Sequence, residues 1–99
     1  MKYELRSTEY FDKWLAKIRG ATAKKRLLAR FDMVSNGHFG DHKQLDERLF
    51  ELRLFYGPGY RVYYTISGGN IVFLLAGGDK SSQTQDIAKA RAILHDLEE

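Results

Sequence analysis

Apolar residues recur at helical spacing in two neighbouring segments of the N-terminal half. The first segment carries an apolar stripe at Phe11, Trp14, Leu15 and Ile18. Ser7 or Thr8 can cap this helix, and Gly20 ends it. A second helix is predicted over 21–35, followed by an Asn-Gly stop, with its stripe at Leu27, Leu28, Phe31 and Val34. The short connection around Gly20 predicts that the two helices form a helical hairpin.

The second half of the chain has the pattern of strands and then of one more helix. A short strand is expected at 2–7, and three more follow at 48–56, 60–67 and 70–76. The range 37–47 is interpreted as a loop. Glycine-rich turns lie at 57–59 and at 68–69, the second with or without Asn70. Ser82 with Gln85, or Thr84 alone, can cap the last helix. The element order is therefore strand, two helices, three strands and helix.

Side-chain alternation divides the predicted hairpin into two faces. With the turn centred on Pro58, the core face carries the pairs Leu54–Val62, Leu52–Tyr64 and Phe50–Ile66. The opposite face then places Arg53 against Tyr63 and Arg61 against Phe55.

The third strand extends these faces. A two-residue second turn assigns Ile71, Phe73 and Leu75 to the core face. It assigns Val72, Leu74 and Ala76 to the arginine face, and Lys80 joins that face if the alternation continues. An apolar strand on the arginine face predicts that another part of the chain, or a ligand, covers it.

Composition sets the class of protein. The 99 residues and 43% hydrophobic content suit one domain over 1–99. Without cysteine there is no disulfide and no thiolate chemistry. The N-terminus lacks the apolar core of a signal peptide, and the longest apolar run, 71–76, is too short to span a bilayer. We therefore expect a cytoplasmic protein with no membrane partner.

Positive charge is concentrated in the predicted helical hairpin. The chain has a net charge of +3, and its range 13–30 contains seven Lys or Arg residues and no acid. This range is either an ordinary solvated surface or a positive field that faces phosphates or an acidic protein.

Four short motifs, in order, resemble the RelE/ParE toxin superfamily, and within it the HigB-like addiction module killer proteins. They are Gly-Asp-His-Lys at 40–43, Glu-Leu-Arg at 51–53, Tyr-Gly-Pro-Gly-Tyr-Arg-Val-Tyr at 56–63 and Gly-Gly-Asp-Lys-Ser-Ser-Gln at 77–83. A Phe-x-x-Trp-Leu segment at 11–15 also fits, so the resemblance covers essentially the whole chain. It implies an α+β fold, with a helical hairpin packed on a twisted, mainly antiparallel sheet of about four strands, and a C-terminal helix.

The same resemblance implies the toxin of a type II toxin–antitoxin module. The usual activity is cleavage of mRNA, often on the translating ribosome, and the implied partner is a small helix-turn-helix antitoxin. Two alternatives stay open: a non-enzymatic ParE-type toxin that inhibits DNA gyrase, and a remnant that only binds its antitoxin or RNA.

Metal-free RNA cleavage needs cations for the charge that develops on the phosphorane. Arg53 and Arg61 suit this role because guanidinium groups bind phosphate oxygens bidentately and stay charged. Lys80 reaches the same phosphate in this scheme, and all three positions match basic residues of the superfamily's ribonucleases.

Other residues are assigned to RNA binding or proton transfer. Tyr63 or Phe55 is expected to stack a base, and His42 and Lys43 to contact RNA. The general base and acid are left open among His42, Lys43, Glu51 and Asp79, with Glu51 the candidate base. Three scattered histidines without cysteine do not predict a metal site, and no cofactor is expected.

Overall fold

The computed structural model describes residues 2–98 as one mixed sheet with helices on both faces. In chain order the elements are β1 (Glu4–Ser7), α1 (Glu9–Ala16), α2 (Ala21–Ser35), β2 (His42–Gln44), β3 (Phe50–Arg53), β4 (Tyr60–Ser67), β5 (Ile71–Asp79), the 3₁₀ turn η1 (Lys80–Ser82) and α3 (Gln83–Glu98). The predicted element order is confirmed, with β2 added to it.

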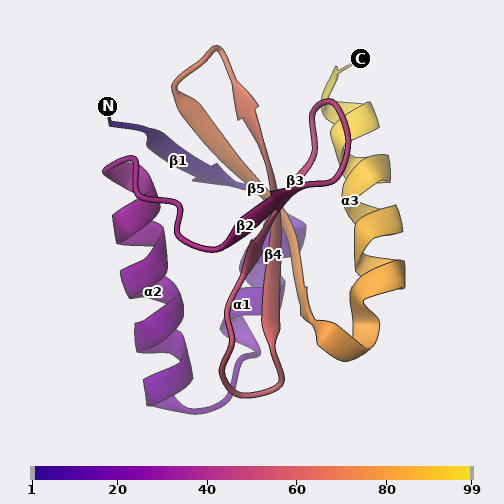
Figure 1. Ribbon diagram of the computed structural model, residues 1–99. Coiled ribbons are helices and arrows are strands. Elements are labelled where there is room, and N and C mark those ends of the chain that lie inside the picture. Colours follow the sequence, from indigo (N-terminus) through magenta and orange to yellow (C-terminus); the bar gives the residue numbers. More distant parts are fainter. Residues whose placement is uncertain (1, 99) are drawn as a thin grey trace.

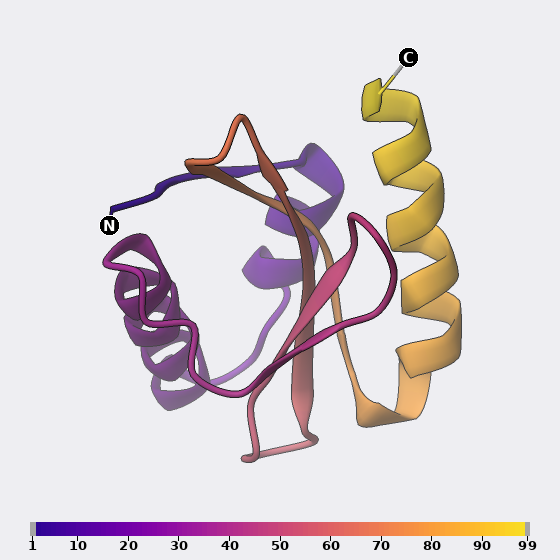
Figure 2. The same cartoon turned by 45° about the horizontal axis from the view of Figure 1, so that its top comes forward.

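The sheet has the strand order β1-β5-β4-β3-β2. β1 runs parallel to β5, and every other pair is antiparallel. The α1–α2 hairpin covers one face and α3 covers the other (Figures 1 and 2). The α+β class is confirmed. The arginine face is covered by α3, as predicted, although only Ala76 of the three β5 residues on which that prediction rested lies under α3.

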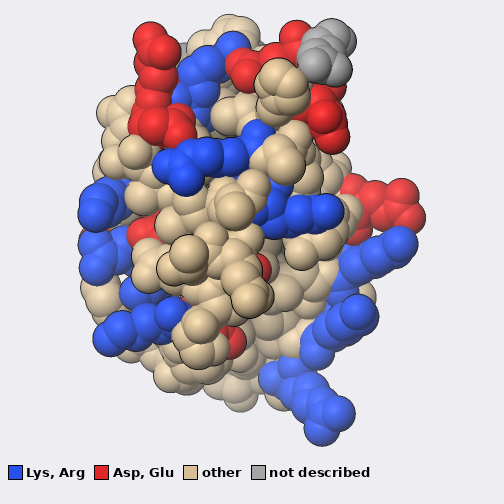
Figure 3. Space-filling model, turned by 90° about the vertical axis from the view of Figure 1, so that its right-hand side faces the viewer, with Lys and Arg blue, Asp and Glu red and all other residues tan. Residues whose placement is uncertain are grey.

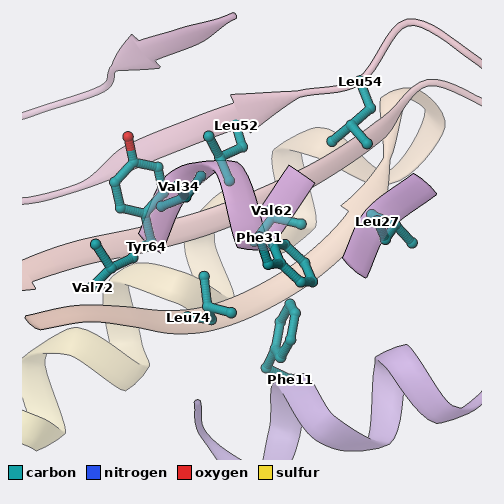
Figure 4. Close-up of a cluster of buried hydrophobic side chains, with 10 residues drawn as sticks. All are labelled: Phe11, Leu27, Phe31, Val34, Leu52, Leu54, Val62, Tyr64, Val72 and Leu74. Carbon is teal, nitrogen blue, oxygen red and sulfur yellow. The ribbon is translucent and has the colours of Figure 1, made fainter. Parts of the chain in front are cut away.

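Two apolar clusters, one on each face, hold these layers together. The cluster under the helical hairpin consists of Phe11, Leu27, Phe31, Val34, Leu52, Leu54, Val62, Tyr64, Val72 and Leu74 (Figure 4). The cluster under α3 consists of Leu49, Tyr63, Leu75, Ala76, Ala90 and Leu94. Because both faces of the sheet are covered, β5 carries buried apolar residues on both sides, whereas β4 also buries the polar residues Arg61 and Thr65 on the α3 face.

Thr8 fixes the start of α1 against the sheet. Its hydroxyl accepts a hydrogen bond from the Phe11 backbone N–H at 3.0 Å and donates to the Leu75 carbonyl at 2.8 Å. One side chain therefore caps the helix and ties it to β5.

The register of the β3–β4 hairpin differs from the prediction. Arg53 pairs with Arg61, and Leu52 with Val62, so each residue lies opposite a partner two positions earlier than predicted. The Leu54 N–H donates to the Tyr60 carbonyl at 3.0 Å, which centres the turn on Gly57 rather than Pro58. A shift of two residues preserves alternation, so the predicted faces of β3 and β4 are right although the pairs are wrong.

The predicted faces of β5 are wrong for most of its length. Ser67 pairs with Ile71, so three residues form the turn instead of two, and alternation is reversed. Val72 and Leu74 therefore lie under the helical hairpin, while Leu75 packs under α3. A register shift near Tyr63 returns Ala76 to the α3 face, as predicted.

Several boundaries also differ. His42–Gln44, predicted as loop, is a fully exposed edge strand whose polar sequence gives no alternation to detect. β5 continues through Gly77 and Gly78 to Asp79, which caps η1 in place of the predicted Ser82 or Thr84. No helix within residues 2–98 is long and apolar enough to cross a membrane.

Candidate functional site

Two neighbouring rows of residues cross the α3 face of the sheet. In the first row the Arg53 N–H donates to the Asp41 carbonyl at 3.0 Å, Arg53 pairs with Arg61, and Arg61 pairs with Gly78. The second row consists of Lys43, Glu51, Tyr63 and Ala76. Charged groups predicted from separate motifs are thus adjacent.

The three predicted catalytic cations meet around one hollow of about 390 Å³ at the end of the sheet. Its lining consists of Arg53, Arg61, Lys80 and the turn residues Phe55, Tyr56, Gly57, Pro58 and Gly59. On this face of the molecular surface, the acids lie mainly in the upper half, and Lys and Arg lie along both sides of the lower half (Figure 3). The three cations at this hollow therefore make this end of the molecule attractive to anions.

Arg61 is a buried cation at this hollow. The residue is 4% exposed, and its Nη1 donates to the carbonyls of Gly59 at 3.1 Å and Tyr60 at 3.2 Å. Its Nε has no hydrogen-bond partner, and no carboxylate within residues 2–98 forms an ion pair with it. Buried charges are normally paired, so this guanidinium favours an anion beside it.

Arg53 lies beside two carboxylates. Its Nε is 3.8 Å from Asp41 Oδ2 and 4.0 Å from Glu51 Oε1, and its side chain is 34% exposed. These distances are those of ion pairs rather than hydrogen bonds. Because its side chain is 34% exposed and Arg61 is only 4% exposed, Arg53 is the more accessible of the two arginines.

Arg30, on α2, fixes the strand positions from the other side. Its guanidinium donates to the carbonyls of Phe39, Asp41 and Arg53 at 3.0, 2.6 and 3.1 Å. Burial lowers the pKa of Arg30 from its ordinary value. Gly40 has a φ of +68° and lies against this guanidinium, which accounts for the glycine in the 40–43 motif.

The 77–83 motif builds the end of the site next to Lys80. A Cβ on Gly78 would lie 1.7 Å from Asp86 Oδ2, so only glycine lets α3 approach here. The Asp79 carboxylate accepts hydrogen bonds from the Ser81 hydroxyl at 2.5 Å and from the Ser81 N–H at 2.8 Å. These bonds lower the pKa of Asp79, and the bond from the hydroxyl has the largest effect. Lys80 follows as an exposed residue at the rim.

The predicted RNA contacts divide into accessible and buried groups. Phe55 is 73% exposed, and its ring centroid lies 5.5 Å from the Arg53 guanidinium carbon and 6.0 Å from that of Arg61. Tyr63 is fully buried under α3, where no base reaches it for stacking. Burial, and then the charge of Glu51, raise the pKa of Tyr63.

The two predicted contacts on β2 lie on opposite faces. Lys43 is exposed and pairs in register with Glu51, which places it in the second row. His42 pairs with Leu52, on the hairpin side, and its Nδ1 is 2.8 Å from the Gly40 carbonyl. No cluster of three metal-ligating side chains occurs in the described part of the chain.

Glu51, the candidate base, is 1% exposed, and its Oε2 accepts from Gln83 Nε2 at 2.8 Å. Sequence reasoning did not single out Gln83, Asp41 or Arg30 as site residues. Asp41 and Gln83 belong to the motifs at 40–43 and 77–83, and their place in these motifs could have identified them. No sequence pattern indicates Arg30, because its interactions depend on how α2 packs against the sheet.

Comparison with known proteins gives one relative in sequence and several in structure. The chain is 41% identical over 97 residues to a Haemophilus influenzae protein described as uncharacterized, covering 98% of each chain. No protein-family model matches the chain.

Among solved structures, a free mutant of the Escherichia coli toxin RelE matches with a TM-score of 0.73 and 22% identity, over 93% of this chain and 97% of that one. The toxin–antitoxin complex RelBE of E. coli matches with a TM-score of 0.64 and 21% identity, over 78% and 95%. The archaeal RelE–RelB complex of Pyrococcus horikoshii matches with 0.61 and 17%, over 81% and 97%. The fold is therefore RelE-like.

Proposed function

We propose that this chain, which belongs to one family with the H. influenzae protein and has the RelE-like fold, is a toxin that cleaves mRNA. In this proposal it is the toxin of a type II toxin–antitoxin module, acts on the translating ribosome and belongs to the HigB-like branch. The branch assignment rests on the motifs at 40–43, 51–53, 56–63 and 77–83.

The observation that carries the proposal is the buried Arg61 guanidinium, which lacks a carboxylate partner in the described chain. It lies at a hollow that Arg53 and Lys80 also line. A phosphodiester supplies the negative charge that such a site lacks. The exposed Phe55 ring beside the two guanidinium groups suits a stacked base, as in single-stranded RNA recognition.

The chemistry that fits this site is attack of a ribose 2′-OH on the adjacent phosphate. The new bond joins O2′ to phosphorus, and the bond from phosphorus to the 5′ oxygen breaks. A base takes the 2′-OH proton, and an acid gives a proton to the leaving 5′ oxygen. Arg53, Arg61 and Lys80 stabilise the charge on the phosphorane, and each such group typically contributes about 3 kcal/mol.

The partner in this proposal is a helix-turn-helix antitoxin. Solved complexes of RelE-fold toxins with RelB support an antitoxin as the partner. Its helix-turn-helix class rests on the sequence motifs alone. On α2, Leu28 is 55% exposed and lines a hollow with Lys24, while Met33 is 48% exposed and lines a separate hollow with Arg26. An amphipathic antitoxin helix with acidic flanks fits either apolar and basic hollow.

The test is primer extension on a cellular mRNA after brief induction of the chain. We expect discrete cuts in translated regions with the wild type. Removal of one charge-stabilising group should lower cleavage by about 10²- to 10³-fold, so Lys80→Ala should leave few cuts. Lys80 is the informative position because it is exposed, so its loss leaves no cavity.

Arg91→Ala is the matched control. Arg91 is an exposed cation on α3 that pairs with Asp46 at 3.0 Å and does not line the hollow. Its loss should leave the cuts unchanged. Intact transcripts with growth still arrested would refute the ribonuclease and direct the search to gyrase supercoiling.

A further inference from the structure

Three motifs far apart in the chain converge on the side chain of Arg53. Glu51 comes from the 51–53 motif, Asp41 from the 40–43 motif and Gln83 from the 77–83 motif. Gln83 Nε2 donates to Glu51 Oε2 at 2.8 Å. The other carboxylate oxygen, Oε1, and Asp41 Oδ2 both lie within 4.0 Å of Arg53 Nε.

We propose that Glu51 is a positioning residue that acts through Arg53, and that Gln83 holds its carboxylate in place. The inference rests on the proposed ribonuclease function and assigns Glu51 a role other than the general base.

The burial of Glu51 supports this role. A general base must come within hydrogen-bond distance of the 2′-OH, and Glu51 is only 1% exposed beneath α3. One of its oxygens is already bonded to Gln83, and the other faces Arg53. Substrate does not reach such a carboxylate without displacement of its neighbours.

The geometry at Arg53 explains what the carboxylate does. Both acids lie nearest to Nε, at ion-pair distances and without a hydrogen bond, and within residues 2–98 the terminal nitrogens of Arg53 donate no hydrogen bond. Those terminal nitrogens remain available for phosphate oxygens. The two acids also offset the electrostatic repulsion between Arg53 and Arg61, which lie directly opposite each other in the sheet.

A double-mutant cycle in RNA cleavage tests the inference. Glu51→Gln keeps the shape and a hydrogen-bond acceptor for Gln83 but removes the charge. We expect it to lower cleavage roughly tenfold in the wild-type background, which is within the range of couplings between contacting groups. In an Arg53→Ala background the same substitution should have less than about a twofold effect. If Glu51→Gln lowers cleavage by the same factor in the wild-type and Arg53→Ala backgrounds, the proposal is overturned and Glu51 is favoured as the general base.

A second readout does not depend on activity. The Arg53 Nε–H resonance in a ¹⁵N-edited NMR spectrum should move in Glu51→Gln, because the nearest anion has lost its charge. It should also move in Gln83→Met, which removes the donor and keeps the length of the side chain. Gln85→Met, at an exposed position on the same helix, should leave it in place.

These readouts separate the two proposals. If the wild type does not cut RNA but the Arg53 resonance responds to both substitutions, the ribonuclease proposal fails and the positioning of Arg53 stands. If the resonance does not respond in Gln83→Met, the positioning role is refuted, whether or not Glu51→Gln folds.

Discussion

Arg53 and Arg61 lie directly opposite each other on β3 and β4, so two guanidinium groups share one end of the α3 face. Like charges directly opposite destabilise a sheet. Asp41 and Glu51 flank Arg53, but no carboxylate in the described chain pairs with Arg61. A bound anion at the hollow would therefore stabilise the folded protein.

Inorganic phosphate should raise the free energy of unfolding at constant ionic strength. A ligand at 100 times its Kd stabilises the protein that binds it by about 2.7 kcal/mol. The measurement is the urea midpoint as phosphate replaces chloride. The response should shrink in Lys80→Ala and persist in Arg91→Ala. An equal response in both variants would mean a general salt effect rather than a site.

Phe55→Ala should weaken RNA binding without loss of stability. The ring is 73% exposed beside both guanidinium groups, so it contributes little to the core. Loss of one stacked base costs about 1–3 kcal/mol, or roughly a fivefold to 150-fold rise in Kd. Fluorescence anisotropy with a 2′-deoxy oligonucleotide measures binding without cleavage.

Tyr10→Ala is the control for Phe55, because Tyr10 is another exposed aromatic residue that lies outside the hollow. Its substitution should leave the anisotropy unchanged. The stacking role would be refuted if Phe55→Ala binds the oligonucleotide as tightly as the wild type does.

Element order and the two faces of β3 and β4 could be read from the sequence because alternation and helical spacing are local. The pairs could not, because the register depends on how many residues the turn uses. One residue more in the 68–70 turn reversed the faces of β5, and the register shift near Tyr63 partly reversed them again. Polar strand β2 carried no alternation at all.

The same limit applies to the site. Arg53, Arg61 and Lys80 were predicted as one cluster and do line one hollow, although their chemical roles remain predictions. The contacts of Gln83 and Arg30 join residues 32 and 23 positions apart, and only packing brings them together. The burial of Tyr63 likewise depends on α3, whose placement no local pattern gives.

Asp79→Ala should lower stability more at pH 7 than at pH 3. Hydrogen bonds from Ser81 hold the pKa of Asp79 below its ordinary value. A depressed pKa contributes stability above the unfolded-state pKa of about 3.9, and this contribution is lost as pH falls through the folded-state value. Loss of a cap costs about 1 kcal/mol at neutral pH.

Urea unfolding at both pH values measures this difference. Asp96→Ala is a suitable control, because Asp96 is exposed near the end of α3, away from the cap. A cost for Asp79→Ala that is as large at pH 3 as at pH 7 would show that its carboxylate charge is not what stabilises η1.

Gly77→Ala should destabilise the packing between α1 and β5. A Cβ at this position would lie 2.2 Å from Cε3 of Trp14, so the indole must move. Trp14 packs against Phe11 and Tyr60, at centroid distances of 5.6 and 6.2 Å, so a displaced indole loses contacts with these rings. Overpacking of this kind typically costs about 1–3 kcal/mol.

Trp14 is the single tryptophan of the chain, so its fluorescence reports the displacement directly. We expect a shifted emission maximum in folded Gly77→Ala together with a lower urea midpoint. In a Trp14→Leu background the cost of Gly77→Ala should become smaller, because the clashing ring atoms are absent. An equal cost in both backgrounds would instead assign the effect to the backbone of β5, and not to the indole that covers it.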